Sequence, residues 1–295
     1  MDNDKNTADR KVILCPNAQS DVGFVVSRKA SEILKKNGRR PVFCPVFDNE
    51  PSDYVSAGDF EVADLDSEVR TAEMIITFGG DGTILRVARA AAVYDVPILG
   101  VNLGGKGFLT ELDAEEVHLI ELAFTEGFRI GSRMMLDVEV VRDGEIVCRD
   151  CALNDVVIKG DNKVIDLTLL SDGKEMSHFS GDGAVIATPT GSTAYSMAAG
   201  GPIVEPRAHN IIITPVCAHI LEAKAFVLTS DRRVSVQIGK KKRNPAYMSV
   251  DGGEHTDIQC GDIINARKSV RFTHFVRLSN MSFYKKVSEK LGERR

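Results

Sequence analysis

A glycine-rich segment, Gly79-Gly80-Asp81-Gly82-Thr83, follows a short apolar run and opens an alanine-rich stretch. Glycines at the carboxyl end of a strand let a phosphate chain approach the backbone, and the helix behind offers unpaired N–H groups and a positive dipole. Gly79, Gly80, Gly82 and Thr83 are therefore predicted phosphate contacts. A negative charge repels phosphate, so we interpret Asp81 as facing a hydroxyl nucleophile, which its carboxylate orients and whose proton it accepts. The alternative is an ordinary Asp-Gly turn in which Asp81 caps a helix.

A second candidate segment runs from residue 183 to residue 204 and contains no charged side chain. Its two prolines, its glycines and its many hydroxyl groups do not suit a lipid-spanning helix. They indicate a loop that surrounds a polar ligand, in which Tyr195 can stack on a ring. The alternative is that residues 188–196 only connect a strand to a helix capped by Ser192, and that Asn154-Asp155 is only a turn.

Two further motifs are weaker. Residues 100–106 satisfy the spacing of a P-loop, but Gly107 stands where that loop needs a hydroxyl, so we interpret the segment as a glycine-rich loop that brings Phe108 to the same strand end. The alternative for Phe108 is a core aromatic residue. Cys148 and Cys151 form a C-x-x-C pair without a second pair, which favours buried thiols over a zinc site.

Hydrophobic periodicity predicts the elements that hold these motifs. Short apolar runs at residues 12–14, 42–44, 74–78 and 98–101 alternate with helical patterns at 23–36 and 83–93, which predicts a doubly wound parallel sheet with helices on both faces. After about residue 131 the pattern alternates with period two and is punctuated by Asp-Gly turn signals at 143–144, 172–173 and 251–252, which predicts an antiparallel all-β domain. Residues 283–291 are predicted to be helical.

These patterns predict the domain limits. Residues 1–10 form a disordered tail, residues 11–125 and the C-terminal helix 280–295 form the α/β domain, and residues 126–279 form the all-β domain. The formal net charge of −5 gives no reason to expect nucleic acid or an anionic membrane as a partner. The basic run at 240–243 is interpreted as a solvated hairpin tip. Six scattered cysteines and a polar N-terminus without the features of a signal peptide favour a cytoplasmic protein.

Taken together, the motifs resemble those of the NAD kinase family. The segment 79–83 is shared with diacylglycerol-type lipid kinases and approximately with phosphofructokinases, so alone it indicates only phosphoryl transfer. The second half is more specific: residues 153–157 (LNDVV) resemble that family's Asn-acid motif, and residues 181–183 (GDG) with 188–196 (TPTGSTAYS) resemble its most diagnostic signature. Asp155 stands where the family usually has Glu, and Ser180 where Arg is common.

The resemblance implies a phosphofructokinase-like α/β domain, an all-β dinucleotide-binding domain, and transfer of the γ-phosphate of ATP to the 2′-hydroxyl of the adenosine ribose of NAD, with Asp81 as proton acceptor. It also implies homo-oligomers, either dimers or tetramers, and the chemistry implies Mg²⁺ with no protein ligand that the sequence identifies. The residues that it implies for NAD binding are Asp81, Gly82, Phe108, Asn154, Asp155, Asp182, Thr193, Ala194, Tyr195 and Ser196.

Two other functions stay open. A lipid or sugar kinase could share the 79–83 segment, and a dinucleotide-binding sensor could keep the fold without catalysis. The sequence also leaves open the choice between ATP and polyphosphate as donor, between NAD and NADH as acceptor, and any feedback by the product.

Overall fold

The computed structural model describes residues 10–46, 61–105, 107–218, 224–239, 244–279 and 282–292. The predicted tail, apart from Arg10, and the basic run at 240–243 lie outside the described residues. The chain divides into two compact units, Met1–Ser132 with Thr273–Arg295 (unit 1), and Arg133–Phe272 (unit 2). The domain limits predicted from the sequence stay predictions.

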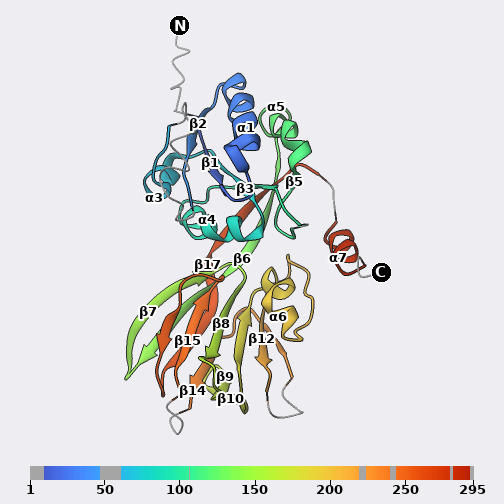
Figure 1. Ribbon diagram of the computed structural model, residues 1–295. Coiled ribbons are helices and arrows are strands. Elements are labelled where there is room, and N and C mark those ends of the chain that lie inside the picture. Colours follow the sequence, from blue (N-terminus) through green and yellow to red (C-terminus); the bar gives the residue numbers. More distant parts are fainter. Residues whose placement is uncertain are drawn as a thin grey trace. The chain divides into compact units, whose positions relative to one another are not determined.

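Unit 1 is built on parallel strands in the order β4-β3-β1-β2, of which β1, β2 and β3 are labelled in Figure 1. They are β1 (Lys11–Pro16), β2 (Arg40–Phe43), β3 (Met74–Gly79) and β4 (Ile98–Asn102), and nearly all of their residues are buried. The connection from β1 to β2 contains α1 (Val25–Lys36), and the one from β3 to β4 contains α4 (Asp81–Val93). Because such crossovers are right-handed and these two run in opposite directions across the sheet, α1 and α4 cover opposite faces. The predicted doubly wound α/β fold is confirmed.

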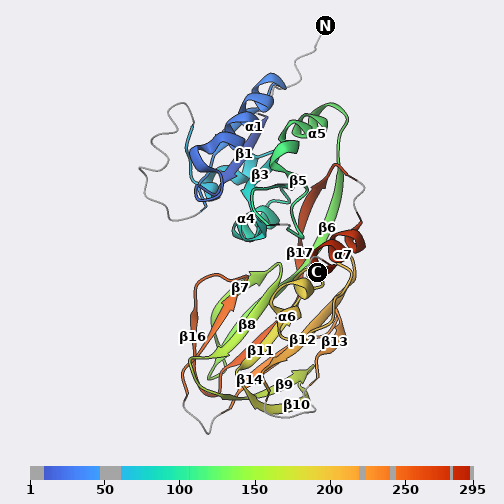
Figure 2. The ribbon, with the colours of Figure 1, turned by 45° about the vertical axis from the view of Figure 1, so that its right-hand side comes forward.

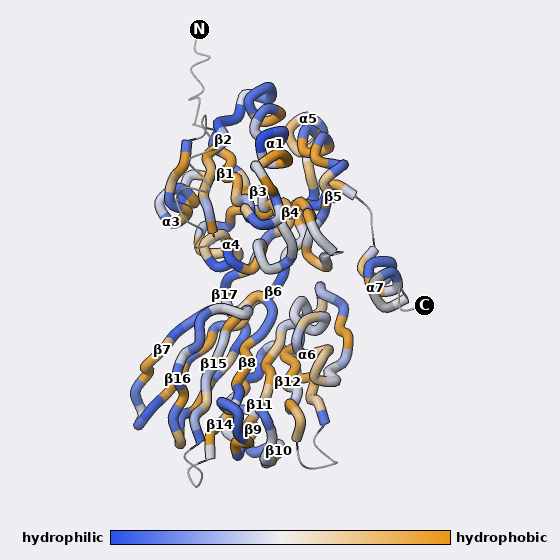
Figure 3. The backbone as a smooth tube through the Cα atoms, viewed as in Figure 1, coloured by the Kyte–Doolittle hydropathy of each residue, from blue (hydrophilic) through white to orange (hydrophobic). Residues whose placement is uncertain are grey.

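The remaining elements of unit 1 surround this sheet. They include η1 (Val22–Phe24), α3 (Leu65–Glu68), η2 (Val69–Thr71), β5 (Leu112–Asp113), η3 (Ala114–Glu121), α5 (Leu122–Thr125) and α7 (Phe283–Gly292). In Figure 3 the strands β1 and β3 are coloured mainly as hydrophobic, while α1 carries hydrophilic residues as well. Phe275 of β17 pairs in parallel with Ile98 of β4, so the end of the chain returns to the first sheet.

Unit 2 is dominated by strands, which confirms the predicted all-β class. One set comprises β6 (Arg129–Arg142), β7 (Glu145–Ala152), β9 (Ile165–Ser171), β10 (Lys174–Gly181), β14 (Val234–Ile238) and β17 (Ile263–Arg277), of which β6 and β17 contribute residues to both units. The other, in the order β13-β12-β11-β8-β15-β16, comprises β8 (Asp155–Gly160), β11 (Gly183–Ala187), β12 (Asn210–Val216), β13 (Phe226–Thr229), β15 (Ala246–Val250) and β16 (Thr256–Ile258).

The two sets of strands share one hydrophobic core, with Leu167, Phe179 and Val236 from the first set and Ile158 and Ile186 from the second. Figure 2 shows β8, β11, β12 and β13 side by side, with the short helices η4 (Gly191–Thr193) and α6 (Tyr195–Ala198) in the same unit. The predicted Asp-Gly turns at 143–144, 172–173 and 251–252 all have positive φ at both residues, as type I′ turns require.

Two further findings concern disulfide bonds and membrane-spanning helices. All six cysteines are free thiols, and burial is the main cause that raises the pKa of Cys44 and of Cys151 to about 12. None of the helices in the described part of the chain has the length and apolar character needed to cross a bilayer.

Candidate active site

The segment 79–83 forms the turn from β3 into α4. Gly79 is the last residue of β3, Gly80 is the N-cap in an extended conformation, and Asp81 is the first helical residue. Among the described residues no side chain caps this end of α4, which leaves the N–H groups of Asp81 and Gly82 available to an anion. Gly80 is half-buried and Gly82 is exposed, whereas a Cβ atom at Gly79 would lie 2.3 Å from Thr83 Oγ1. The loop is therefore shaped for a close backbone approach at residues 80–82.

Thr83 differs from the other predicted phosphate contacts. Its side chain is buried and faces Gly79, and among the described residues its Oγ1 has no hydrogen-bond partner. Its backbone N–H donates to the carbonyl of Gly80 at 3.1 Å. The structure thus places the Thr83 hydroxyl inside the loop, away from solvent.

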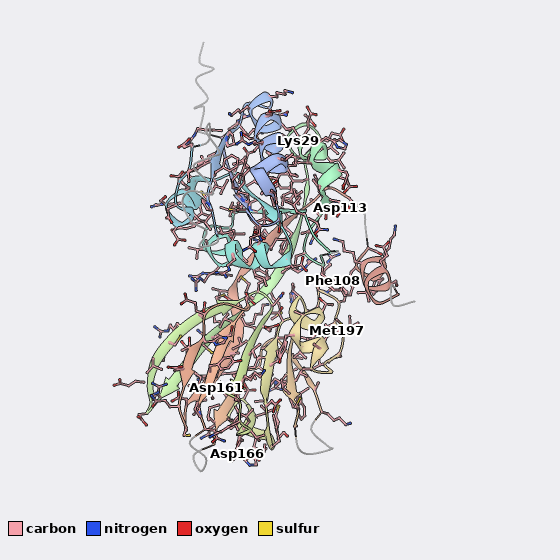
Figure 4. The ribbon with its side chains drawn as sticks, in the orientation of Figure 1. Lys29, Phe108, Asp113, Asp161, Asp166 and Met197 are labelled. Atoms are coloured by element: carbon pink, nitrogen blue, oxygen red, sulfur yellow. The ribbon has the colours of Figure 1, made fainter. Side chains whose placement is uncertain are left out.

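The carboxylate of Asp81 is fixed by the loop that follows β4. Oδ2 accepts the N–H of Phe108 at 2.8 Å, and Oδ1 accepts the N–H of Leu109 at 3.0 Å. A Cβ atom at Gly107 would lie 2.4 Å from Oδ1, so the absence of a side chain there permits this contact. Phe108 is half-buried and is labelled in Figure 4. The structure therefore brings Asp81 and Phe108 together, and each carboxylate oxygen keeps lone-pair capacity for a further donor.

In unit 2 the segment 153–155 is held by a residue that the sequence analysis interpreted only as part of a turn. The carboxylate of Asp251 accepts the N–H groups of Leu153 at 2.7 Å, Asn154 at 2.7 Å and Asp155 at 3.0 Å. The N–H of Asp251 in turn donates to the carbonyl of Asp155 at 3.0 Å. Asp251 is thus the anchor of the predicted Asn-acid motif. The only signal in the sequence was the Asp-Gly pair itself.

The segment 188–195 packs against the same residues. Thr188 donates its hydroxyl to the carbonyl of Leu153 at 2.6 Å and its N–H to the carbonyl of Asn154 at 2.8 Å. Gly191 lies so close that a Cβ atom there would be 2.0 Å from the carbonyl oxygen of Asn154. The N–H of Tyr195 donates to the Asp155 carboxyl group. The two motifs of the second half, far apart in the sequence, therefore meet in one cluster.

Most hydroxyl groups of this cluster are engaged within the protein. Ser192 donates to the carbonyl of Pro189 at 2.7 Å, Thr193 donates to the carbonyl of Thr190 at 3.2 Å, and the buried Ser196 hydrogen-bonds Thr214 at 2.9 Å. Ala194 is half-buried, and Tyr195 is 39% exposed. Within the described part of the chain, Asn154 Oδ1 and Thr190 Oγ1 are buried without a partner. Such unsatisfied groups occur in functional sites, where a ligand supplies the missing partner.

Asp182 lies apart from this cluster. It precedes β11, where its N–H donates to Val216 at 3.0 Å and its carbonyl accepts from Gly160 at 2.9 Å. Asp155 pairs with Ala187 at the other end of β11, so about 20 Å of extended chain separates Asp182 from Thr188. Within one chain, the structure does not bring Asp182 together with the other predicted contacts of unit 2.

The Asp155 and Asp251 carboxyl groups both have raised pKa values, and the charge of Asp251 contributes to that of Asp155. Burial, and then the charge of Asp251, raise the pKa of Asp155 to about 7, against the hydrogen bond from Tyr195. Burial also raises the pKa of Asp251 to about 6, against its three backbone N–H donors. Because those three donors need an ionised acceptor, we place the proton that the pair retains on Asp155.

The stability of unit 2 is therefore expected to depend on pH through Asp155. Its pKa is raised in the folded state, so its stabilising contribution is complete below about pH 4, the pKa of an unfolded Asp, and is lost as the pH rises through about 7. The side chain of Asp155→Asn is neutral at every pH. The free energy of unfolding of this variant, minus that of the wild type, should therefore increase by about 1.4 kcal/mol for each pH unit across this range. Urea unfolding of both proteins at several pH values measures the difference. A difference that does not change with pH would contradict the buried protonated form.

The described residues offer no group of three or more His, Cys, Asp or Glu side chains arranged for a metal ion.

Comparison with known proteins gives a consistent result. The model of the ATP-NAD kinase N-terminal domain matches residues 5–125, and that of the ATP-NAD kinase C-terminal domain matches residues 153–278. The NAD kinase of Ruminiclostridium cellulolyticum is 35% identical over 97% of this chain and 99% of its own length. That of Natranaerobius thermophilus is 38% identical over 96% of this chain and 98% of its own length.

Solved structures share the fold. Yeast NADH kinase, solved in complex with NADH, has a TM-score of 0.84 at 22% identity and covers 98% of this chain and 89% of its own. An NAD kinase from Archaeoglobus fulgidus, solved in complex with ATP, has a TM-score of 0.73 at 24% identity and covers 96% of this chain and 98% of its own. With both domain models matched and relatives aligned over nearly their whole length, the chain belongs to the NAD kinase family.

Proposed function

We propose that this protein transfers the γ-phosphate of ATP to the 2′-hydroxyl of the adenosine ribose of NAD and so forms NADP. The observation that carries the proposal is the fixed Asp81 carboxylate at the uncapped N-terminus of α4, in a member of the NAD kinase family. The helix N-terminus stabilises phosphate oxygens, and the carboxylate beside it accepts a proton.

In the proposed reaction, one phosphorus–oxygen bond forms as another breaks, and one proton is transferred. The ribose 2′-oxygen attacks the γ-phosphorus, the bond from that phosphorus to the β–γ bridging oxygen breaks, and ADP leaves. The hydroxyl proton passes to Asp81. Because the N–H groups of Phe108 and Leu109 hold both carboxylate oxygens, the acceptor is oriented before the substrate arrives.

The cluster in unit 2 recognises the dinucleotide in this proposal. Among the described residues, Asn154 has an amide oxygen without a hydrogen-bond partner, and the ring of Tyr195 is partly exposed for stacking. The pKa of Asp155 is raised to about 7, so its protonated form is available near neutral pH to donate to the ligand. Thr193 and Ala194 are half-buried and can contact the dinucleotide through backbone and side-chain atoms. Ser196 supports the cluster through its hydrogen bond to Thr214. Asp182 is retained as a contact to the nicotinamide half of NAD, as the family resemblance implies.

Magnesium enters the proposal as MgATP. Mg²⁺ commonly keeps several waters and binds through substrate phosphates and one or two carboxylates. The uncapped N-terminus of α4, which can bind phosphate oxygens, suits that mode. The ion would neutralise charge on the polyphosphate during transfer, which is its usual contribution to this chemistry.

We also propose a cytoplasmic homo-oligomer, either a dimer or a tetramer. The free cysteines suit a reducing compartment. The terminal strands β13 and β16 of the six-stranded sheet are edges of the kind that can pair with another copy.

The proposed activity is tested by incubating the purified protein with NAD, ATP and Mg²⁺ and detecting NADP with an NADP-specific dehydrogenase. NADP formation supports the proposal. Parallel reactions with NADH as acceptor and with polyphosphate as donor determine the substrate preference. Transfer to a lipid or a sugar but to no dinucleotide would contradict the proposal, and so would NAD binding without turnover in any of these reactions.

Tyr195→Ala is expected to weaken NAD binding by about 1–3 kcal/mol, the usual worth of base–aromatic stacking. Tyr195→Phe keeps the ring and should bind NAD almost as the wild type does. Tyr94, 44% exposed in unit 1, provides the control Tyr94→Ala. Equilibrium titration with NAD measures the effect, and equal affinities for Tyr195→Ala and Tyr94→Ala would mean that Tyr195 is only a scaffold residue.

A further inference from the structure

The loop that fixes Asp81 is itself held from its other side. Phe108 and Leu109 direct their N–H groups to Asp81 at 2.8 and 3.0 Å. The carbonyl groups of Leu109 and Thr110 accept hydrogen bonds from two cationic side chains near the C-terminus. A short segment of four residues, 107–110, is thus bonded to a carboxylate through its N–H groups and to cations through its carbonyl groups.

Arg277, at the end of β17, is the first of these cations. Its Nη1 lies 3.3 Å from the carbonyl oxygen of Leu109 and 2.9 Å from Glu111 Oε2. Glu111 also accepts the N–H groups of Leu278 at 2.9 Å and of Ser279 at 2.7 Å. The side chain of Glu111 is only 3% exposed, so this connection between the loop and the end of β17 is partly desolvated.

Lys286 on α7 is the second cation. Its Nζ donates to the carbonyl oxygen of Thr110 at 2.7 Å, and the residue is half-buried. The neighbouring Lys285 differs, because its side chain is 64% exposed and its Nζ lies 3.9 Å from Glu289 on the same helix. Two adjacent lysines of one helix therefore have different partners, and Lys286 is the one bonded to the loop.

We infer that Lys286, with Arg277, is a positioning residue for phosphoryl transfer, because it holds the 107–110 loop in the place where its N–H groups orient Asp81. The inference rests on the proposed function of Asp81. Hydrogen bonds with a charged donor are shorter and stronger than neutral ones, so the carbonyl side of the loop has little freedom to shift. A loop that shifts changes the direction of the Asp81 carboxylate, and catalysis is sensitive to misplacement on the scale of 1 Å.

The test compares Lys286→Met with Lys286→Arg and with Lys285→Met. Lys286→Met keeps the apolar stem and should lower kcat about tenfold, which corresponds to ~1.4 kcal/mol, while KM for NAD changes less than about twofold. Lys286→Arg keeps a cationic donor and should recover most of kcat. Lys285→Met should behave as the wild type does, and the thermal midpoints of the three variants establish that each is folded.

A second arm separates positioning of Asp81 from general support of the fold. In the Asp81→Asn background, Lys286→Met should lower the rate of single-turnover NADP formation by less than about twofold, because the proton acceptor that it positions is already absent. A tenfold loss in both backgrounds, or a wild-type kcat for Lys286→Met, would overturn the inference. If Asp81→Asn alone keeps the wild-type rate, it is the proposed role of Asp81 that fails, so the two failures are distinguishable.

Discussion

Replacing Asp81 by Asn is expected to lower kcat by a factor of about 10² to 10⁴, the usual worth of a positioned general base, while NAD binds with nearly unchanged affinity. The amide can orient the ribose hydroxyl but cannot accept its proton. It also has only one oxygen, so it can accept the N–H of Phe108 or that of Leu109 but not both as the carboxylate does. The expected decrease in kcat therefore has two causes, namely the loss of the proton acceptor and the loss of one hydrogen bond to the loop.

The measurement is the rate of NADP formation in the coupled assay, with NAD affinity determined separately by equilibrium titration. Asp66→Asn is a matched control, because Asp66 is an exposed acid in the first turn of another helix of unit 1, namely α3. Lys286→Met reports the cost of disturbing the loop while the Asp81 carboxylate is still present, and its loss of kcat should be smaller. A near-wild-type rate for Asp81→Asn would leave Asp81 as a clamp for the loop and would remove it from the chemistry.

The sequence was sufficient for the parallel strands β1 to β4 and for α1, α4 and α7 of unit 1, but not for its shorter elements such as α3, β5 and η3. A parallel strand covered on both faces must be apolar throughout, as in Ile75-Ile76 of β3, so strands of this kind stand out as short runs. Gly38 at positive φ follows the end of α1, in the place where a glycine commonly ends a helix. The type I′ turns are equally local, because only a few residue types accept positive φ at two successive positions.

The contacts that assemble the candidate site were not predictable in the same way. Asp81 is bonded to Phe108 and Leu109, which lie 27 and 28 residues away, and Asp251 to residues nearly 100 positions away. A residue type reveals that a group can accept a hydrogen bond but not which donor the fold brings to it. The sequence correctly suggested an Asp-Gly turn at Asp251, yet nothing local indicated that its carboxylate receives three N–H groups.

The partners of the hydroxyl groups in residues 183–204 could not be predicted from composition either. Its composition suggested hydroxyls directed at a ligand, but Ser192 and Thr193 donate to carbonyls three residues earlier in the chain, and Ser196 bonds Thr214. Ser and Thr satisfy nearby backbone groups as readily as they bind ligands, and composition cannot separate these uses. In the described part of this cluster, Asn154 and Thr190 have side-chain oxygens without a hydrogen-bond partner, and Tyr195 is exposed.

Asp251→Ala is expected to lower the free energy of unfolding by about 2–4 kcal/mol, because it leaves the N–H groups of Leu153, Asn154 and Asp155 without their acceptor. It should also raise KM for NAD, since Asn154 and Asp155 lose their anchor. Asp143→Ala is the matched control, because Asp143 occupies the same position of an Asp-Gly turn with φ of 51°, against 50° at Asp251. Any cost of placing Ala at positive φ is then common to both variants.

The difference between these two variants isolates the carboxylate of Asp251. A thermal midpoint roughly 5–12 °C lower for Asp251→Ala than for Asp143→Ala corresponds to the expected loss. Asp251→Asn should lie between them, because one oxygen remains to accept while the new NH₂ group faces donors. Equal midpoints and equal KM values for the two Ala variants would mean that Asp251 serves only its turn, and that the segment 153–155 is held by Thr188 and the packing of Gly191 alone.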